Sequence, residues 1–315
     1  MLIAYVISPS AFVAALPVLT HKIRERPKSM PLIVRYPRID YRNIPAHWTH
    51  NIAFAQDRNA TSLVPAPVEP WLIRILQSAV QQLGDRDASL REEVAAFIGQ
   101  ESQHFRQHRQ FNKAMAAKGY PKLVELEQDL ANDLEEFART RSLKFLMAYA
   151  DGFESMGAVA GGVWFEHSDA MLEGADPNAT ALWKWHMAEE FEHREVCFKF
   201  YHALFGRGLF KAIVNGYFYR VYGLVFAMRH LSRHIARIRA YLLEVDKAGM
   251  DAGQLRKLEQ DTREFEAFQK RHFLPQLLKN FLPWYDPGRK PVPRGLPEYL
   301  KRFETGGDMA RQPSL

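Results

Sequence analysis

The chain has 315 residues and a formal net charge of +6, and 47% of its residues are hydrophobic and 25% charged. This is the composition of an ordinary globular protein that can bury a full core. The single cysteine, Cys197, excludes a disulfide framework and a thiolate-rich zinc module, and it favours a cytoplasmic location. Zinc-finger spacing, RNA-binding signatures and dense basic runs are absent from the sequence, so nucleic acid is not expected as a partner.

Residues 1–20 carry no charged side chain, and basic residues follow them. A membrane anchor is one explanation, but Pro9 and Pro17 interrupt the apolar run, and proline is unfavourable inside a spanning helix. A secretory signal carries its basic residues before the apolar stretch rather than after it. We therefore favour a start of translation at Met30, which makes residues 1–30 an N-terminal apolar extension with a misassigned start.

From Glu69 onward the sequence predicts one helix after another. Residues 31–68, rich in proline and polar residues, predict an irregular lead-in, and residues 283–315 predict a proline-rich tail. No stretch sustains a period of two, so we expect an all-α fold with a helical metal-binding domain over residues 69–282. Glycine and proline stop signals, with Asn178 as one cap, delimit the predicted helices: Glu69–Leu83, Ser89–Lys118, Lys122–Arg139, Ser142–Leu172, Ala179–Phe205, Leu209–Lys247 and Ala252–Leu282.

The segment Leu209–Tyr241 combines aromatic side chains with five arginines. A basic, aromatic helix can lie on an anionic membrane surface. A stripe of aromatic residues is more often the face by which a helix packs on its parent bundle. We favour packing over peripheral membrane contact.

Two predicted helices carry a Glu-x-x-His motif, whose glutamate and histidine lie one turn apart and can share a metal ion. One such motif has little weight, because roughly one is expected by chance at this composition. The weight comes from order, since each motif helix follows a helix with one further glutamate. The ligands therefore repeat in sequence: Glu69 before Glu101 and His104, and Glu154 before Glu190 and His193.

This order is typical of ferritin-like di-iron carboxylate bundles. The expected fold is therefore a ferritin-like four-helix bundle with additional C-terminal helices. Four carboxylates balance two divalent ions, and oxygen-rich ligation suits iron, with manganese or zinc as other possibilities. Glu101 and Glu190 are the candidates to bridge both ions, while Glu69 and Glu154 bind one each.

Further polar residues follow the same helix faces. His186 is either a seventh ligand or a hydrogen-bond partner of a ligating carboxylate, and we favour the second role for His108. The order His186-x3-Glu190-x2-His193 resembles that of the di-iron arylamine N-oxygenases. We expect Asp151 to accept a hydrogen bond from a ligating histidine.

Other residues near the motifs have simpler expected roles. Glycines such as Gly157 and Gly161 permit close helix contact or leave space beside the metals, and we favour close contact. We interpret Cys197 as a core residue, and Glu189, Glu192 and Glu195 as solvated carboxylates.

Two strings around the motifs, Phe97-Ile-Gly-Gln-Glu-Ser-Gln-His104 and Trp185-His-Met-Ala-Glu-Glu-Phe-Glu-His193, resemble a bacterial family of predicted metal-dependent hydrolases. The resemblance runs from about Pro31 to Tyr285. The usual Pro-Glu-Gly-Glu entry to the first helix of that family corresponds here to Pro67-Val-Glu-Pro70, which keeps the carboxylate of Glu69. The resemblance implies metal dependence and, by its name, hydrolysis.

Three functions remain open from the sequence. The favoured one is a di-iron oxidase or oxygenase that acts on a small, largely apolar molecule. The alternative is a hydrolase in which the metals activate water. A third is non-enzymatic iron binding, which predicts many ions per chain.

Overall fold

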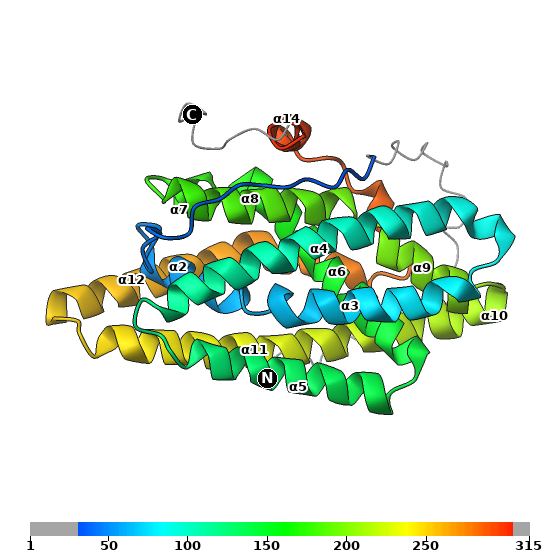
Figure 1. Cartoon of the computed structure of the whole chain (residues 1–315), viewed down its shortest axis with the longest axis horizontal. Coiled ribbons are helices and arrows are strands. Elements are labelled where there is room, and N and C mark those ends of the chain that lie inside the picture. The colour runs from blue at the N-terminus through cyan, green and yellow to red at the C-terminus, as the bar shows by residue number, and fades with distance from the viewer. Residues whose placement is uncertain (1–30, 305–315) are drawn as a thin grey trace.

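The computed structural model describes residues 31–304, so the apolar extension over residues 1–30 and the end of the tail lie outside the described residues. The described part of the chain is all-α and contains no strand. Its principal helices are long and lie along one common direction (Figure 1). They are α2 (Ile52–Thr61), α3 (Pro65–Ala79), α4 (Ala88–Ala116), α5 (Leu123–Thr140), α6 (Leu143–His167), α8 (Pro177–Glu192), α9 (Val196–Phe205), α11 (Arg220–Lys247) and α12 (Ala252–Phe268).

Shorter elements connect these helices or follow them. A π-helical segment, Ala212–Tyr219, leads into α11, and a second one, Gln269–Phe273, follows α12. The remaining helices are α7 (Asp169–Leu172), α10 (Leu209–Lys211), α13 (Leu274–Leu278) and α14 (Leu296–Lys301), and the 3-10 turns are Val80–Gln82, Asp85–Asp87, Lys279–Phe281 and Pro287–Arg289.

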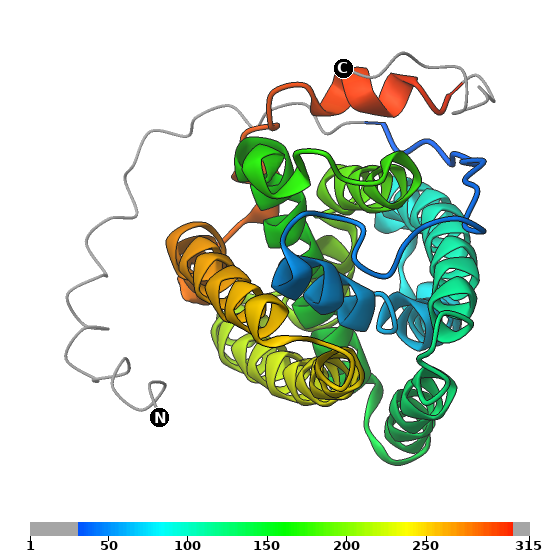
Figure 2. The same ribbon diagram turned by 90° about the vertical axis from the view of Figure 1, so that its left-hand side faces the viewer.

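Helix α3 packs against α4, and α6 packs against α8, so that these four helices form the centre of the molecule. Helix α11 lies along α6, and α2 fills the space between α11, α12 and the core (Figure 2). The short helix α14 packs on the outer face of α8. The prediction of an all-α fold is confirmed, while the assignment to the ferritin-like class stays a prediction.

The lead-in is more helical than expected. Helix α2 lies within it, and Asn51 caps this helix by accepting a hydrogen bond from the Phe54 amide at 2.8 Å. Helix α3 begins at Pro65 rather than at Glu69, which places Pro70 inside the helix. Proline has no N–H for the carbonyl four residues earlier. That carbonyl, of Ala66, instead accepts a hydrogen bond from Arg109 at 3.3 Å.

The helix predicted over Ala179–Phe205 is two helices. Asp176, not Asn178, caps α8 by accepting hydrogen bonds from two backbone amides at 2.9 Å, and Pro177 occupies the first helical turn. Helix α8 ends at Glu192, and α9 starts at Val196. The break follows the second Glu-x-x-His motif directly, so its histidine lies at the end of a helix.

Glycines allow α6 to approach its neighbours closely. A Cβ atom on Gly223 of α11 would lie 2.5 Å from the Cβ of Ala148, and a Cβ on Gly152 would lie 2.8 Å from the Cα of Leu224. A Cβ on Gly161 would lie 2.4 Å from the carbonyl oxygen of Met187 on α8. Close helix contact therefore explains these glycines.

The C-terminal part of the chain differs from the prediction in its helices and in its tail. Each of the predicted helices Leu209–Lys247 and Ala252–Leu282 contains a π-helical segment. The region after residue 283 contains α14, whose Leu296 and Leu300 are buried. Helix α11 packs on the bundle through residues such as Leu224, whereas Leu209 and Phe210 are exposed. Among the described residues, no helix has the length and apolar character needed to cross a membrane.

We expect Gly223→Ala to lower the free energy of unfolding by about 2 kcal/mol, because the added methyl group would overlap backbone and side-chain atoms of Ala148. Gly249→Ala is the matched control, because its Cβ would meet no atom closer than 3.9 Å. Urea unfolding of both variants measures the difference. Equal stabilities would show that α6 and α11 are not in close contact.

Candidate metal centre

Seven side chains from the four central helices converge in the interior of the molecule. Helices α3 and α6 each supply one glutamate, and α4 and α8 each supply a Glu-x-x-His motif, with one more histidine on α8. Each of the seven is at most 2% exposed. They are Glu69, Glu101, His104, Glu154, His186, Glu190 and His193.

The ligand atoms of these residues form two groups, and within each group all of them lie within 4.8 Å of one another. Glu190 belongs to both groups, as a bridging carboxylate must. The first group, called group A below, is Glu69, His104, His186 and Glu190, and the second, group B, is Glu101, Glu154, Glu190 and His193.

A second carboxylate also lies between the two groups. Glu101 Oε1 is 3.3 Å from His193 Nε2 of group B and 3.5 Å from His104 Nδ1 of group A. This position suits the bridging role that the sequence suggested for Glu101.

The donor set fits two divalent cations. Both carboxylate oxygens of Glu69 and Glu101, and Nδ1 of His104, are buried and have no hydrogen-bond partner among the described residues. Buried carboxylates without a partner are strongly unfavourable, whereas cations coordinated by them supply the missing charge. Oxygen-rich ligation with imidazole suits iron and manganese, and zinc is compatible with it.

Hydrogen bonds orient two of the histidines towards the centre. His104 Nε2 is 2.9 Å from Glu189 Oε2, which leaves Nδ1 facing Glu101. His193 Nδ1 is 3.1 Å from Gln100 Oε1, which leaves Nε2 facing the carboxylates. Such partners fix the tautomer of a ligating imidazole. Each histidine therefore offers one defined nitrogen to a metal.

The expectation that Glu189, Glu192 and Glu195 are solvated is wrong. They are 0%, 5% and 9% exposed. Arg35 donates to Glu189 at 2.9 Å and to Glu192 at 2.8 Å and balances one of these two negative charges. Arg35 lies in the lead-in, more than 150 positions away, and no local pattern links it to them.

His186 lies among the candidate ligands of group A rather than behind them. Its Nε2 lies 2.9 Å from Glu190 Oε1 and 3.4 Å from Glu69 Oε1. Its Nδ1 is 2.6 Å from Nε2 of His108. His108 thus contacts the candidate ligand His186, not a carboxylate as expected.

A chain of hydrogen bonds continues outward from His108. Its Nδ1 is 2.7 Å from the Ser62 hydroxyl, which donates to Asn112 Oδ1 at 2.6 Å. The Asn112 amide donates in turn to Glu127 at 2.8 Å. Each group in this chain has a donor and an acceptor when His186 is neutral and ligates through Nε2.

Asp151 does not have the predicted role. Its carboxylate pairs with Arg220 Nε at 2.7 Å instead of with a histidine. Arg220 also donates to the Ser155 hydroxyl and to the Asn280 carbonyl, and so it ties α6 to the start of α11 and to the C-terminal region. Cys197 is buried, as expected for a core residue, and burial raises the pKa of its thiol.

The four buried glutamates differ in the direction in which their pKa values are shifted. Burial, together with repulsion between the carboxylates, raises the pKa values of Glu69 and Glu154 well above the usual range. Burial raises the pKa of Glu101 from 4.5 to about 8. Burial acts to raise the pKa of Glu190 too, but hydrogen bonds with His186 and His193 outweigh it and lower that pKa.

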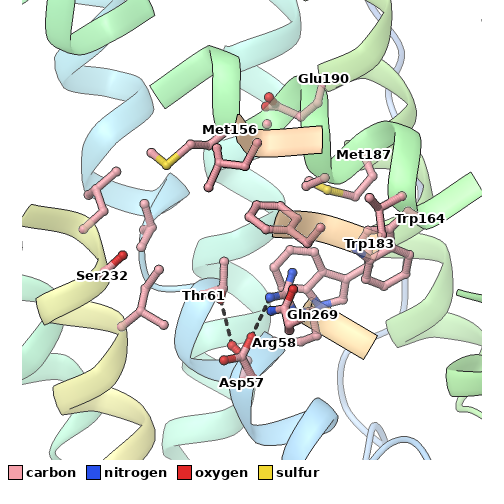
Figure 3. Close-up of a pocket in the computed structure, with 18 of the residues that line it drawn as sticks. Asp57, Arg58, Thr61, Met156, Trp164, Trp183, Met187, Glu190, Ser232 and Gln269 are labelled. Carbon is pink, nitrogen blue, oxygen red and sulfur yellow. Dashed lines mark hydrogen bonds and ion pairs between the residues drawn. The ribbon is translucent and has the colours of Figure 1, made fainter. Parts of the chain in front are cut away.

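An apolar cavity of about 480 Å³ reaches the centre. Its lining includes Gly157 and His186, together with Glu190, Met156 and Trp183, which are labelled in Figure 3. A Cβ atom on Gly157 would lie 1.7 Å from Glu190 Oε2. This glycine therefore leaves room for the Glu190 carboxylate as well as for the cavity.

One further group of possible ligands was not predicted from the sequence. Asp133 Oδ2 on α5 lies 3.1 Å from His230 Nε2 and 2.9 Å from His234 Nε2 on α11. The two histidines are four residues apart, but the aspartate comes from a distant helix. The group lies outside the central bundle, and its hydrogen bonds join α5 to α11.

Comparison with known proteins identifies a family. A family described as predicted metal-dependent hydrolase matches residues 33–291, a span that includes all the residues of groups A and B. The chain belongs to this family. No match was found among curated proteins or among solved structures.

We expect Gly157→Ala to weaken binding of the metal ions by 10- to 100-fold, because the new methyl group displaces the Glu190 carboxylate. Gly162→Ala, on the same helix, is the matched control, because its Cβ would meet only a Phe191 ring atom at 3.9 Å. Titration of the metal-free proteins with Fe(II), Mn(II) or Zn(II) measures both. Equal affinities would exclude Glu190 as a ligand.

We expect metal binding at pH 7 to release protons, because burial raises the pKa of Glu101 to about 8 and this carboxyl group must lose its proton to ligate. Burial shifts the pKa values of Glu69 and Glu154 in the same direction. Calorimetry in two buffers with different ionisation enthalpies counts the released protons, and identical heats would contradict the prediction.

The folded pKa of Glu101 exceeds the usual 4.5, so the folded chain binds more protons than the unfolded chain. The stability of the metal-free protein therefore falls as the pH rises from 4.5 to about 8.

Proposed function

We propose that this member of the family of predicted metal-dependent hydrolases is a dinuclear metal enzyme that hydrolyses a small, largely apolar substrate. One observation carries the proposal: two buried ligand groups share Glu190, and that residue also lines the apolar cavity. A structural role for the metals alone would not need a cavity at the ligands.

When bound, two divalent ions lower the pKa of a coordinated water and polarise a carbonyl or phosphoryl oxygen. The chain supplies the conditions for this chemistry. Glu189 and Gln100 hold His104 and His193 in one orientation each. The apolar walls exclude bulk water and bind the body of the substrate beside Glu190.

Oxygen activation by two iron ions is a second candidate. The observation in its favour is the donor set, in which four carboxylates and three imidazoles surround the centre without a thiolate. An oxidase or oxygenase of this kind acts on an apolar molecule in a dry cavity. The two candidates differ in their need for dioxygen and in the metals that support turnover.

The test is hydrolysis of p-nitrophenyl acyl esters by protein loaded anaerobically with Zn(II), Mn(II) or Fe(II). We expect turnover without oxygen, and a loss of at least 100-fold in kcat/KM in Glu101→Gln, which removes a ligand charge. His234→Ala, outside the two groups, is the control and retains the activity. Oxygen consumption with Fe(II) alone, without hydrolysis by any loaded form, would replace the hydrolase with the second candidate.

A further inference from the structure

The cavity that reaches the metal centre has a polar group at its other end. Figure 3 shows Glu190 on one side of the residues drawn, and Asp57 and Arg58 on the opposite side. The walls between them are largely apolar and include Met156, Trp164 and Trp183 among the side chains drawn. A molecule that fills the cavity therefore meets a polar group at each end and apolar surface along its length.

The distal polar group carries an excess positive charge. The Asp57 carboxylate accepts from Arg58 at 2.5 Å and from Arg239 of α11 at 3.0 Å. One carboxylate thus neutralises one of two guanidinium groups. Arg58 is only 13% exposed, and its guanidinium lies over the rings of Trp183 and Phe54, at 5.4 and 5.9 Å.

Two donors at this end of the cavity have no acceptor. Arg58 Nε and Trp183 Nε1 are buried and lack hydrogen-bond partners among the described residues. Both residues line the cavity. A buried donor without an acceptor is unfavourable, and a ligand oxygen removes the penalty.

Trp183 connects this polar end to the metal centre. Its ring lies 5.4 Å from the Arg58 guanidinium carbon and stacks at 6.4 Å on the imidazole of His186. One side chain thus forms part of the wall over the whole distance between the cationic group and a ligand of group A. A single small molecule that packs on Trp183 can contact both.

We infer that the substrate is an amphipathic molecule with an apolar body and a carboxylate or similar anionic end group, and that Arg58 binds this end group while the reacting part lies at Glu190. The inference rests on the proposed function only in taking this cavity as the substrate site. Arg58 is suited to the role because a guanidinium held in place by Asp57 and Trp183 forms charge-assisted hydrogen bonds with a carboxylate.

The experiment compares the binding of decanoate and decan-1-ol to the metal-free protein by calorimetry, so that no metal competes for the carboxylate. We expect decanoate to bind about tenfold more tightly than decan-1-ol. Arg58→Gln removes this preference and leaves the affinity for decan-1-ol unchanged. Arg106→Gln, an exposed arginine outside the cavity, is the matched control and keeps the preference.

The variant Arg58→Lys distinguishes loss of the positive charge from loss of the folded structure. It retains the cation, so we expect it to keep most of the preference for decanoate. Equal affinities of the wild-type protein for both ligands would overturn the inference. A preference that survives in Arg58→Gln, or is absent from a folded Arg58→Lys variant, would overturn it too. Failure of the proposed hydrolysis has a different signature, in which decanoate is still preferred but no ester is cleaved.

Discussion

Burial of four carboxylates beside three imidazoles, at the contact of four helices, is the constraint on which the rest of the structure depends. In an apolar interior such a set is stable only when protons or cations balance its charge. The oxygens of Glu69 and Glu101 have no hydrogen-bond partner within residues 31–304, so this part of the chain does not supply that balance. The raised pKa values of these carboxylates have the same cause, and bound cations would supply the missing positive charge.

The buried ion pairs around the centre include residues from both ends of the described chain. Arg35, from the segment before α2, contacts Glu189 and Glu192, and it also reaches Glu304, which follows α14. Glu189 in turn orients His104. Segments that carry no ligand therefore hold a ligand in place, which explains why the buried network extends well beyond the four central helices.

The sequence predicted the parts of the site that depend on local helical geometry. Within a helix, a Glu-x-x-His motif places both side chains on one face, and the repeated order indicated that Glu69 and Glu154 belong with the motifs. The errors concern partners that only tertiary packing decides. Asp151 faces Arg220, and Glu189 faces Arg35, across distances in sequence at which spacing carries no information. The predicted start of the first helix within the proline-rich lead-in was wrong for a related reason. Arg109 donates a hydrogen bond to the carbonyl that Pro70 leaves without a donor, so the helix can continue through this proline.

The two ligand groups are not equivalent, and this difference bears on how a substrate approaches. Group A contains two histidines, and two of its members, His186 and Glu190, line the cavity. Of the residues in group B, only the shared Glu190 lines it. The side chains of group A would therefore hold an ion next to the cavity, whereas those of group B would hold one farther from it. The hydrogen-bond chain from His186 through His108 and Ser62 fixes the orientation of this histidine on the side that faces the cavity.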